Sequence, residues 1–166
     1  MSFNREVNHL FLDLDGVLAD FDKAAMSLMD GIKPETFEET RGTKEFWKRI
    51  GREPDFFRNL PMMPDAMVLY NATKHLRPTI LTGIPSNMDA YANQKIEWVR
   101  KHFGPFQRVI CCPSKKKSAF CIPGDVIVDD RTKYMHHWEE AQGRFIVHFN
   151  AVLSINELMN EGVLVF

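Results

Sequence analysis

The sequence has few cysteines, almost no net charge and no long apolar run. Its three cysteines, Cys111, Cys112 and Cys121, are odd in number and form no Cys-x-x-Cys pair, which favours reduced, buried thiols over a disulfide or a zinc site. A formal net charge of −1 argues against a protein that coats nucleic acid. Because no apolar run is long enough for a membrane span and residues 1–6 do not resemble a signal peptide, we expect a cytoplasmic protein.

The chain nevertheless has the composition of a folded domain. Its 166 residues are 45% hydrophobic, which is enough for one compact core with a small insertion. Apolar runs alternate with helical patterns, which predicts a parallel sheet with helices on both faces. Strands are predicted at 7–14, 79–82, 108–112, 125–129 and 145–148, and helices at 66–76, 89–103 and 133–141, before a last helix that starts with a capping box at Ser154 and Glu157. In helix 89–103 we expect one apolar stripe, formed by Ala92, Ile96, Val99 and Phe103.

Residues 20–64 interrupt this alternation. Four prolines divide the segment into short pieces, and no strand pattern occurs in it. One helix is predicted over 43–51, with Thr43 as N-cap and Gly51 as terminator. We interpret 20–64 as a small helical subdomain, inserted into an α/β core made of 1–19 and 65–166.

Two carboxylates follow the first predicted strand. Asp13 and Asp15 are two residues apart, so a strand sends both side chains to the same side of the backbone. Two acids directed at one point repel each other unless a cation lies between them. The expected cation is Mg²⁺, which prefers oxygen ligands.

Further polar residues follow the other predicted strands. Thr82 and Gly83 end the second, the lysine run 115–117 follows the third, and Asp129 and Asp130 end the fourth. Ligands of parallel sheets bind at the carboxyl ends of the strands, so these groups are expected to meet there. That joint placement indicates phosphate chemistry more specifically than any one motif does.

The residue types suggest a role for each position. Asp13 would attack phosphorus and form an aspartyl-phosphate, while Asp15 would serve as general acid and then as general base. Mg²⁺ would be held by Asp13, by Asp129 and by the main-chain carbonyl of Asp15. Thr82 would donate its hydroxyl to a phosphate oxygen, Gly83 would admit backbone N–H groups, and a lysine would stabilise the transferring group. Asp130 would support the site from behind or cap the following helix.

These motifs, in this order, resemble the haloacid dehalogenase (HAD) superfamily of phosphohydrolases. Within it the chain is similar to the 5′(3′)-deoxyribonucleotidases, through the segments 12–21 (LDLDGVLADF), 56–61 (FFRNLP), 95–104 (KIEWVRKHFG) and 126–131 (VIVDDR). The resemblance implies a HAD-like Rossmannoid three-layer sandwich with a helical cap, and a magnesium-dependent monophosphatase that acts on nucleotides.

The resemblance also bears on individual positions. The spacing to the last motif strand favours Lys117 as the site lysine, then Lys116. Gly83 stands where a deoxyribonucleotidase usually has a hydroxyl residue. The aromatic residues implied for the nucleotide base are Phe46, Trp47, Phe56 and Phe57.

Three other functions remain open from the sequence. A HAD phosphatase could take another small phosphate ester, such as a sugar phosphate, and a protein with this fold could bind a nucleotide without hydrolysing it. A signalling receiver domain also gathers acids, a threonine and a lysine, but its adjacent acids come on the first strand and its lysine last, the reverse of the order here. No nucleic-acid polymer or membrane is expected as a partner, and the oligomeric state is not predicted.

Overall fold

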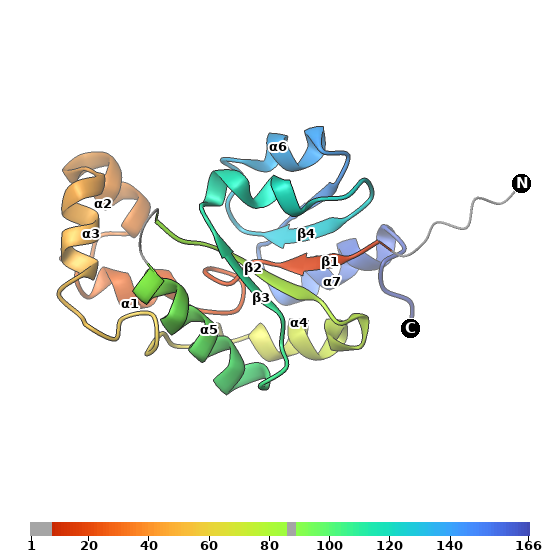
Figure 1. The fold of residues 1–166 in the computed structure, drawn as a ribbon, viewed down its shortest axis with the longest axis horizontal. Helices are drawn as coiled ribbons and strands as arrows, with labels where there is room; N and C mark the ends of the chain where they lie inside the picture. The colour runs from red at the N-terminus through yellow and green to blue at the C-terminus, as the bar shows by residue number, and fades with distance from the viewer. Residues whose placement is uncertain (1–7, 86–88) are drawn as a thin grey trace, which may run out of the picture.

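The computed structural model describes residues 8–85 and 89–166, and it contains a five-stranded parallel sheet (Figure 1). The strands are β1 (Leu10–Leu12), β2 (Thr79–Gly83), β3 (Val109–Cys112), β4 (Val126–Asp129) and β5 (Arg144–Val147). Their order in the sheet is β3-β2-β1-β4-β5, which places β1 at the centre. The predicted α/β class with a central parallel sheet is therefore confirmed.

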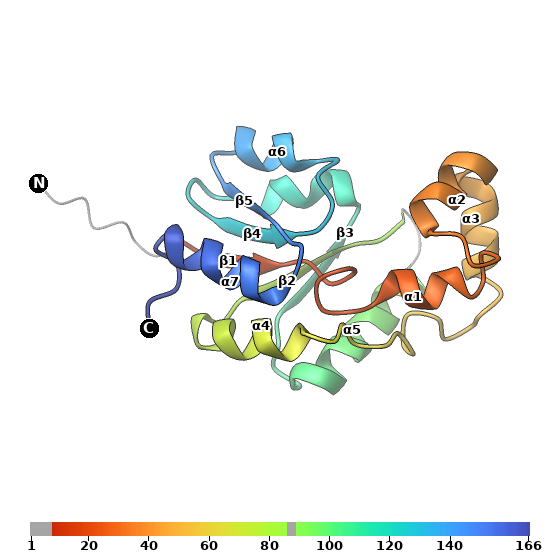
Figure 2. The same cartoon turned by 180° about the vertical axis from the view of Figure 1, so that it is seen from behind.

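Helices cover both faces of this sheet (Figures 1 and 2). One face carries α4 (Ala66–Thr73), α5 (Asp89–Phe103) and α7 (Ala151–Asn160), and the other carries the 3₁₀ helix η2 (Ser114–Phe120) and α6 (Met135–Glu140). A short 3₁₀ helix, η1 (Lys74–Leu76), continues α4. The arrangement is the three-layer sandwich expected from the sequence.

Alternation along the central strand explains the two hydrophobic layers. Leu10 and Leu12 point into the larger cluster, together with Trp98 of α5 and Leu158 of α7. Phe11, between them, points to the opposite face and packs edge-to-face on Trp138 of α6, with ring centroids 5.4 Å apart. A strand covered on both sides in this way reads as a continuous apolar run.

The segment between β1 and α4 forms three short helices at one end of the molecule (Figure 1). They are α1 (Phe21–Met26), α2 (Pro34–Arg41) and α3 (Thr43–Ile50). Their buried side chains, such as Phe37 and Ile50, belong to the same hydrophobic cluster as the larger face of the sheet. The connections into and out of this segment are bonded to each other, because the Asp20 N–H donates to the Pro61 carbonyl (2.8 Å) and the Met63 N–H to the Leu18 carbonyl (2.9 Å).

Two predicted helix starts are wrong, each for a local reason. The N-cap of α3 is Gly42, with Thr43 already helical and its hydroxyl bonded to Glu38 Oε1 instead of to the helix backbone. Helix α7 starts at Ala151, since Asn150 Oδ1 accepts the N–H of Leu153 and so caps the helix before Ser154. Ser154 is buried inside the helix, where its hydroxyl meets His148 Nδ1 at 2.7 Å.

Helix α5 has the predicted bounds but a different buried face. Its buried residues are Gln94, Lys95, Trp98 and Val99, so only Val99 of the predicted stripe lies there. The reason is that Gln94 and Lys95 find hydrogen-bonding partners inside the protein, and a satisfied polar group can occupy a core position. The partners of Lys95 lie at the carboxyl end of the sheet, and those of Gln94 are backbone groups of Pro54, Phe57 and Arg58.

Candidate active site

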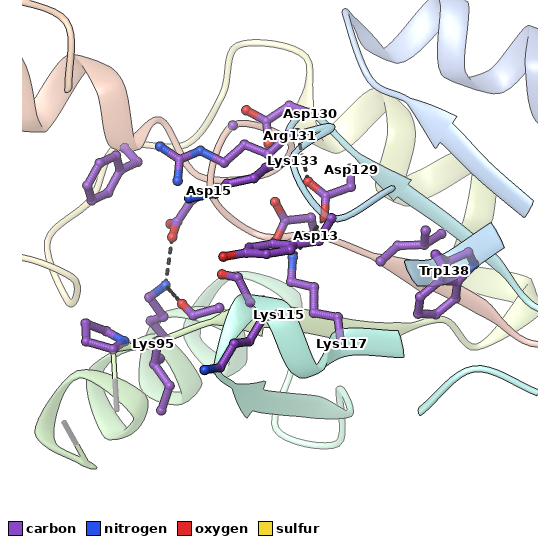
Figure 3. Close-up of a pocket in the computed structure, with 18 of the residues that line it drawn as sticks. Asp13, Asp15, Lys95, Lys115, Lys117, Asp129, Asp130, Arg131, Lys133 and Trp138 are labelled. Carbon is purple, nitrogen blue, oxygen red and sulfur yellow. Dashed lines mark hydrogen bonds and ion pairs between the residues drawn. The ribbon is translucent and has the colours of Figure 1, made fainter. Parts of the chain in front are cut away.

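Three charged residues from distant segments meet where β1 and β4 end (Figure 3). Asp13 directly follows β1, and its N–H donates to the Val128 carbonyl at 2.9 Å, which continues the sheet. The Lys117 ammonium group of η2 lies 2.9 Å from Asp13 Oδ1 and 2.9 Å from Asp129 Oδ2. All three side chains are largely buried, so these charges interact in a medium that screens them weakly.

Lys117 lowers the pKa of both acids, but the net shifts of the two pKa values run in opposite directions. Burial alone would raise the pKa of Asp13, but the charge and hydrogen bond of Lys117 hold that pKa below its usual value. Burial and then the negative charge of Asp13 raise the pKa of Asp129, in spite of Lys117. Asp13 is thus held as a carboxylate, the form in which it is nucleophilic.

A third acid completes a cluster that fits a divalent cation. Asp13, Asp129 and Asp130 each offer one carboxylate oxygen, and these oxygens lie within 4.8 Å of one another. Burial, followed by the charges of Asp13 and Asp129, raises the pKa of Asp130, and its buried Oδ1 has no hydrogen-bond partner. An unpartnered oxygen among three mutually repelling carboxylates matches the donor set of a hard cation such as Mg²⁺.

Asp15 lies on the other side of Asp13, against a residue that the sequence did not single out. Lys95 of α5 is only 2% exposed, and its Nζ donates to Asp15 Oδ2 (2.7 Å), Thr82 Oγ1 (3.1 Å) and the Gly83 carbonyl (2.7 Å). Its ammonium group also lies 4.8 Å from the centre of the Phe57 ring. One buried cation thus joins the ends of β1 and β2.

Thr82 and Gly83 hold different places at the end of β2. Thr82 is fully buried, and its Oγ1 accepts from Lys95, which leaves its own O–H free to donate. Gly83 lines the cavity above Asp13. The N–H of the next residue, Ile84, donates to the Cys112 carbonyl at 2.9 Å, so this donor is committed to the sheet.

The cavity extends from these residues to the α1–α3 segment. Phe46, Trp47 and Phe57, three of the four aromatic residues expected at the substrate, line it together with Phe21. Phe56 is not among the described lining residues. Its ring packs behind the others, 5.6 Å from the Phe21 ring and 5.1 Å from the Phe57 ring.

Cationic side chains surround the mouth of the same cavity. Lys115, Arg131 and Lys133 line it, while Lys116 is not among the described lining residues (Figure 3). The main-chain N–H of Arg131 donates to Asp129 Oδ1 at 2.9 Å and so orients the Asp129 carboxylate. The N-cap of α6 is Tyr134, so Asp130 is not the cap of the following helix.

The sequence that forms this site matches a known family. The model of the family described as "5′ nucleotidase, deoxy (Pyrimidine), cytosolic type C protein" matches residues 5–156, nearly the whole chain. The chain belongs to this family. All residues that meet at the carboxyl end of the sheet lie within the matched range.

Two individual relatives share 28% and 32% sequence identity with this chain. The mouse mitochondrial 5′(3′)-deoxyribonucleotidase is 28% identical, in a match that covers 74% of this chain and 64% of the mouse protein. A protein of Acanthamoeba polyphaga mimivirus, also named as a 5′(3′)-deoxyribonucleotidase, is 32% identical, in a match that covers 74% of this chain and 62% of that protein. The chain therefore spans less than two thirds of the length of these two relatives.

Solved structures support the fold. A hydrolase from Streptococcus pneumoniae TIGR4 superimposes with a TM-score of 0.57 at 12% identity, covering 92% of this chain and 98% of that one. A HAD family hydrolase from Deinococcus radiodurans R1, solved with bound phosphate and sodium, gives 0.54 at 12% identity, covering 95% and 97%. The expected HAD-like fold is thereby confirmed.

Within residues 8–85 and 89–166, no helix combines the length and apolar character that a membrane-spanning helix requires.

Proposed function

We propose that this protein is a magnesium-dependent phosphomonoesterase that hydrolyses nucleoside or deoxynucleoside monophosphates through an aspartyl-phosphate. The observation that carries the proposal is the meeting of Asp13, Asp129 and Lys117 at one end of the sheet, with 2.9 Å between the lysine and each acid. Family membership and the name of the mouse relative support the nucleotide as substrate.

The chain's own residues account for the chemistry in two steps. In the first, the Asp13 carboxylate attacks phosphorus, the bond from phosphorus to the leaving oxygen breaks, and Asp15 gives its proton to that oxygen. In the second, Asp15 takes a proton from water, the water oxygen attacks phosphorus, and the Asp13 carboxylate leaves with release of inorganic phosphate. Lys117 contacts Asp13 and offsets negative charge on the transferring group.

Lys95 would hold Asp15 in place for both steps. Its hydrogen bond fixes Asp15 Oδ2, while Oδ1 of the same carboxyl is buried without a partner. An unpartnered oxygen next to the cavity is available to a leaving group or a water molecule. Thr82 Oγ1 accepts from the Lys95 ammonium group but does not line the cavity with the other described residues, so Thr82 would help to hold Lys95 and would not itself touch the phosphate.

Mg²⁺ would be held by Asp13, Asp129 and the main-chain carbonyl of Asp15, with Asp130 next to them. When bound, it would offset negative charge on the phosphoryl oxygens. The three carboxylates clustered within 4.8 Å support this assignment.

Residues 20–64 would act as a cap over the site. Phe21, Phe46, Trp47 and Phe57 line the cavity from this segment, so a planar base could stack among them while its phosphate reaches Asp13. A cap of this kind excludes water from the reaction.

The three free cysteines agree with a reducing compartment, and we place the protein in the cytoplasm.

The decisive experiment is a phosphate-release screen over nucleotides, sugar phosphates and aryl phosphates, with and without Mg²⁺. We expect turnover of nucleoside monophosphates that needs Mg²⁺ and falls at least about a thousandfold in Asp13→Asn, which lacks the nucleophile. Asp30→Asn is the matched control, because Asp30 is an exposed acid in an ion pair with Arg49, outside the lining of the cavity. Turnover of sugar phosphates alone would disprove the nucleotide substrate, and nucleotide binding without any turnover would disprove the enzyme.

A further inference from the structure

Position 83 holds a glycine for a reason that lies outside its own backbone. Gly83 is not among the residues with positive φ, so its conformation is open to any amino acid. A Cβ built on Gly83 would instead overlap with the hydroxyl oxygen of Ser114 and lie 3.2 Å from its Cβ. The Ser114 side chain therefore occupies the space in which a side chain of residue 83 would stand.

The fold brings Ser114 to this place. Gly83 pairs with Cys112 in the register of β2 and β3, and Ser114 follows two residues later as the first residue of η2. Side chains three residues apart on a 3₁₀ helix lie on the same side. Ser114 and Lys117 therefore point the same way, and Lys117 reaches Asp13.

Ser114 also presents the hydroxyl that the end of β2 lacks in the cavity. Thr82 is fully buried, already accepts a hydrogen bond from Lys95, and does not line the cavity with the other described residues. Of the described lining residues, those with a hydroxyl group are Ser114, Ser118 and Tyr134. Of these three residues, Ser114 supplies the atoms nearest to a Cβ built on Gly83.

We propose that Ser114 binds the phosphoryl group, with its Oγ–H donating to a non-bridging oxygen in place of a side chain at position 83. The inference rests on the proposed phosphatase function and adds a phosphate-binding residue to it. Ser114 and Lys117 then form one unit, in which the lysine contacts the nucleophile and the serine orients the phosphate.

The test uses inorganic phosphate as the probe and measures its affinity by calorimetry in the presence of Mg²⁺, alongside KM and kcat for a nucleoside monophosphate. Ser114→Ala should weaken phosphate binding and raise KM by roughly tenfold or more, because a hydrogen bond to a charged group is lost. Ser114→Thr retains the hydroxyl and should stay within about threefold of wild type.

The double variant Gly83→Ser/Ser114→Gly moves the hydroxyl from η2 to β2. It should recover most of the phosphate affinity that Ser114→Ala loses, whereas Gly83→Ser alone should weaken binding because the two side chains collide. Ser27→Ala is a neutral control, since its hydroxyl is bonded to the Ala24 carbonyl outside the cavity.

Phosphate affinity separates this inference from the proposed function. If Ser114→Ala binds phosphate as tightly as wild type, the role of Ser114 is disproved whatever the enzyme hydrolyses. If wild type binds phosphate and the variant loses affinity, but no phosphate ester is hydrolysed, the serine is supported and the catalytic proposal fails. Wild-type protein that binds no phosphate would overturn both.

Discussion

A buried lysine is the residue on which the geometry around Asp15 depends. Lys95 donates to three oxygens, from the side chains of Asp15 and Thr82 and from the Gly83 carbonyl. An ammonium group has three N–H donors, so each of them is used. The Asp15 carboxyl is therefore oriented by a side chain that does not belong to the strands at all.

Replacement of this lysine should impair the reaction more than the binding of substrate. In Lys95→Met the side chain keeps its approximate length but loses its charge, and Asp15 is no longer held. We expect kcat to fall about a hundredfold or more, in the range of general acid–base catalysis, while KM changes far less. Steady-state kinetics tests this prediction, and circular dichroism shows whether the variant folds. The control is Lys101→Met, which replaces an exposed lysine on the same helix. If Lys101→Met loses as much kcat as Lys95→Met does, the interpretation is contradicted.

The acids of the site could be predicted from single positions, whereas Lys95 could not. Asp13 and Asp15 come after the apolar run of β1, and Asp129 ends that of β4, so the pattern places all three at the carboxyl end of the sheet. Lysine on a helix is ordinarily solvated, so nothing in the type of residue 95 marks it as buried. A signal does exist in its spacing, since Lys95 precedes Trp98 by three residues and Val99 by four and so shares their buried face.

At the scale of elements, α5 connects the sheet to the segment that lines the cavity. Gln94, next to Lys95, is 6% exposed. Its Oε1 accepts the N–H groups of Phe57 (3.1 Å) and Arg58 (3.2 Å), and its Nε2 donates to the Pro54 carbonyl (2.8 Å). Consecutive residues of one helix thus hold the backbone of Phe57 and the carboxyl of Asp15.

This connection predicts a change in selectivity when Gln94 is replaced. Gln94→Met leaves the N–H groups of Phe57 and Arg58 unpaired, and each buried unpaired group costs about 1–3 kcal/mol. We expect a lower melting temperature, and a KM for nucleotides that rises more than the KM for a small aryl phosphate, which does not reach Phe57. Gln107→Met is the matched control, because Gln107 bonds to Tyr70 and to the Pro78 carbonyl away from the cavity. If both variants lower stability but leave the ratio of the two KM values unchanged, Gln94 is only a structural residue.

The elements themselves were predictable where the pattern is long or strongly apolar. Helix α5 and four of the strands lie close to their expected places, and the fifth, β1, is shorter than the predicted 7–14, of which residue 7 lies outside the described residues. Capping was less predictable, because the Ser154–Glu157 pair has the spacing of a capping box but Asn150 caps the helix one turn earlier. Which of two competent caps is used depends on where the preceding strand ends.

For the whole molecule, the acid cluster should make stability depend on the cation. Asp13, Asp129 and Asp130 repel one another in the folded protein, and a cation that binds only there stabilises the native state. At a hundred times its dissociation constant, this amounts to about 2.7 kcal/mol, or a melting temperature several degrees higher. Calorimetric melts with increasing Mg²⁺ measure the effect.

The same melts on variants identify the ligand. Asp129→Asn should lose most of the shift with Mg²⁺ and, with one repelling charge fewer, should be no less stable than wild type without the metal. Asp30→Asn, far from the cluster, should shift as wild type does. An undiminished shift in Asp129→Asn would rule out this residue as a ligand.

The order of the strands also belongs to the whole molecule, and here the sequence had little to offer. Alternating strands and helices predicted a parallel sheet, but not that β1 lies between β2 and β4. That order brings the ends of β1 and β4 together and so makes neighbours of Asp13 and Asp129. The α1–α3 side of the cavity was the least predictable part, because no period describes the packing of its loops and short helices. Phe46 and Phe57 were expected only through the family resemblance, and Phe21 was not expected.

The paired connections at Leu18–Asp20 and Pro61–Met63 have a consequence for how such proteins diversify. Since the chain leaves the sheet and returns to it at the same point, closed by two hydrogen bonds, everything between behaves like the loop of a hairpin. Its length can change without moving a strand, provided that the contacts of its buried side chains and its hydrogen bonds with Gln94 are kept. Variation in this stretch would therefore alter the lining of the cavity, while Asp13, Asp129 and Lys117 would keep their places at the end of the sheet.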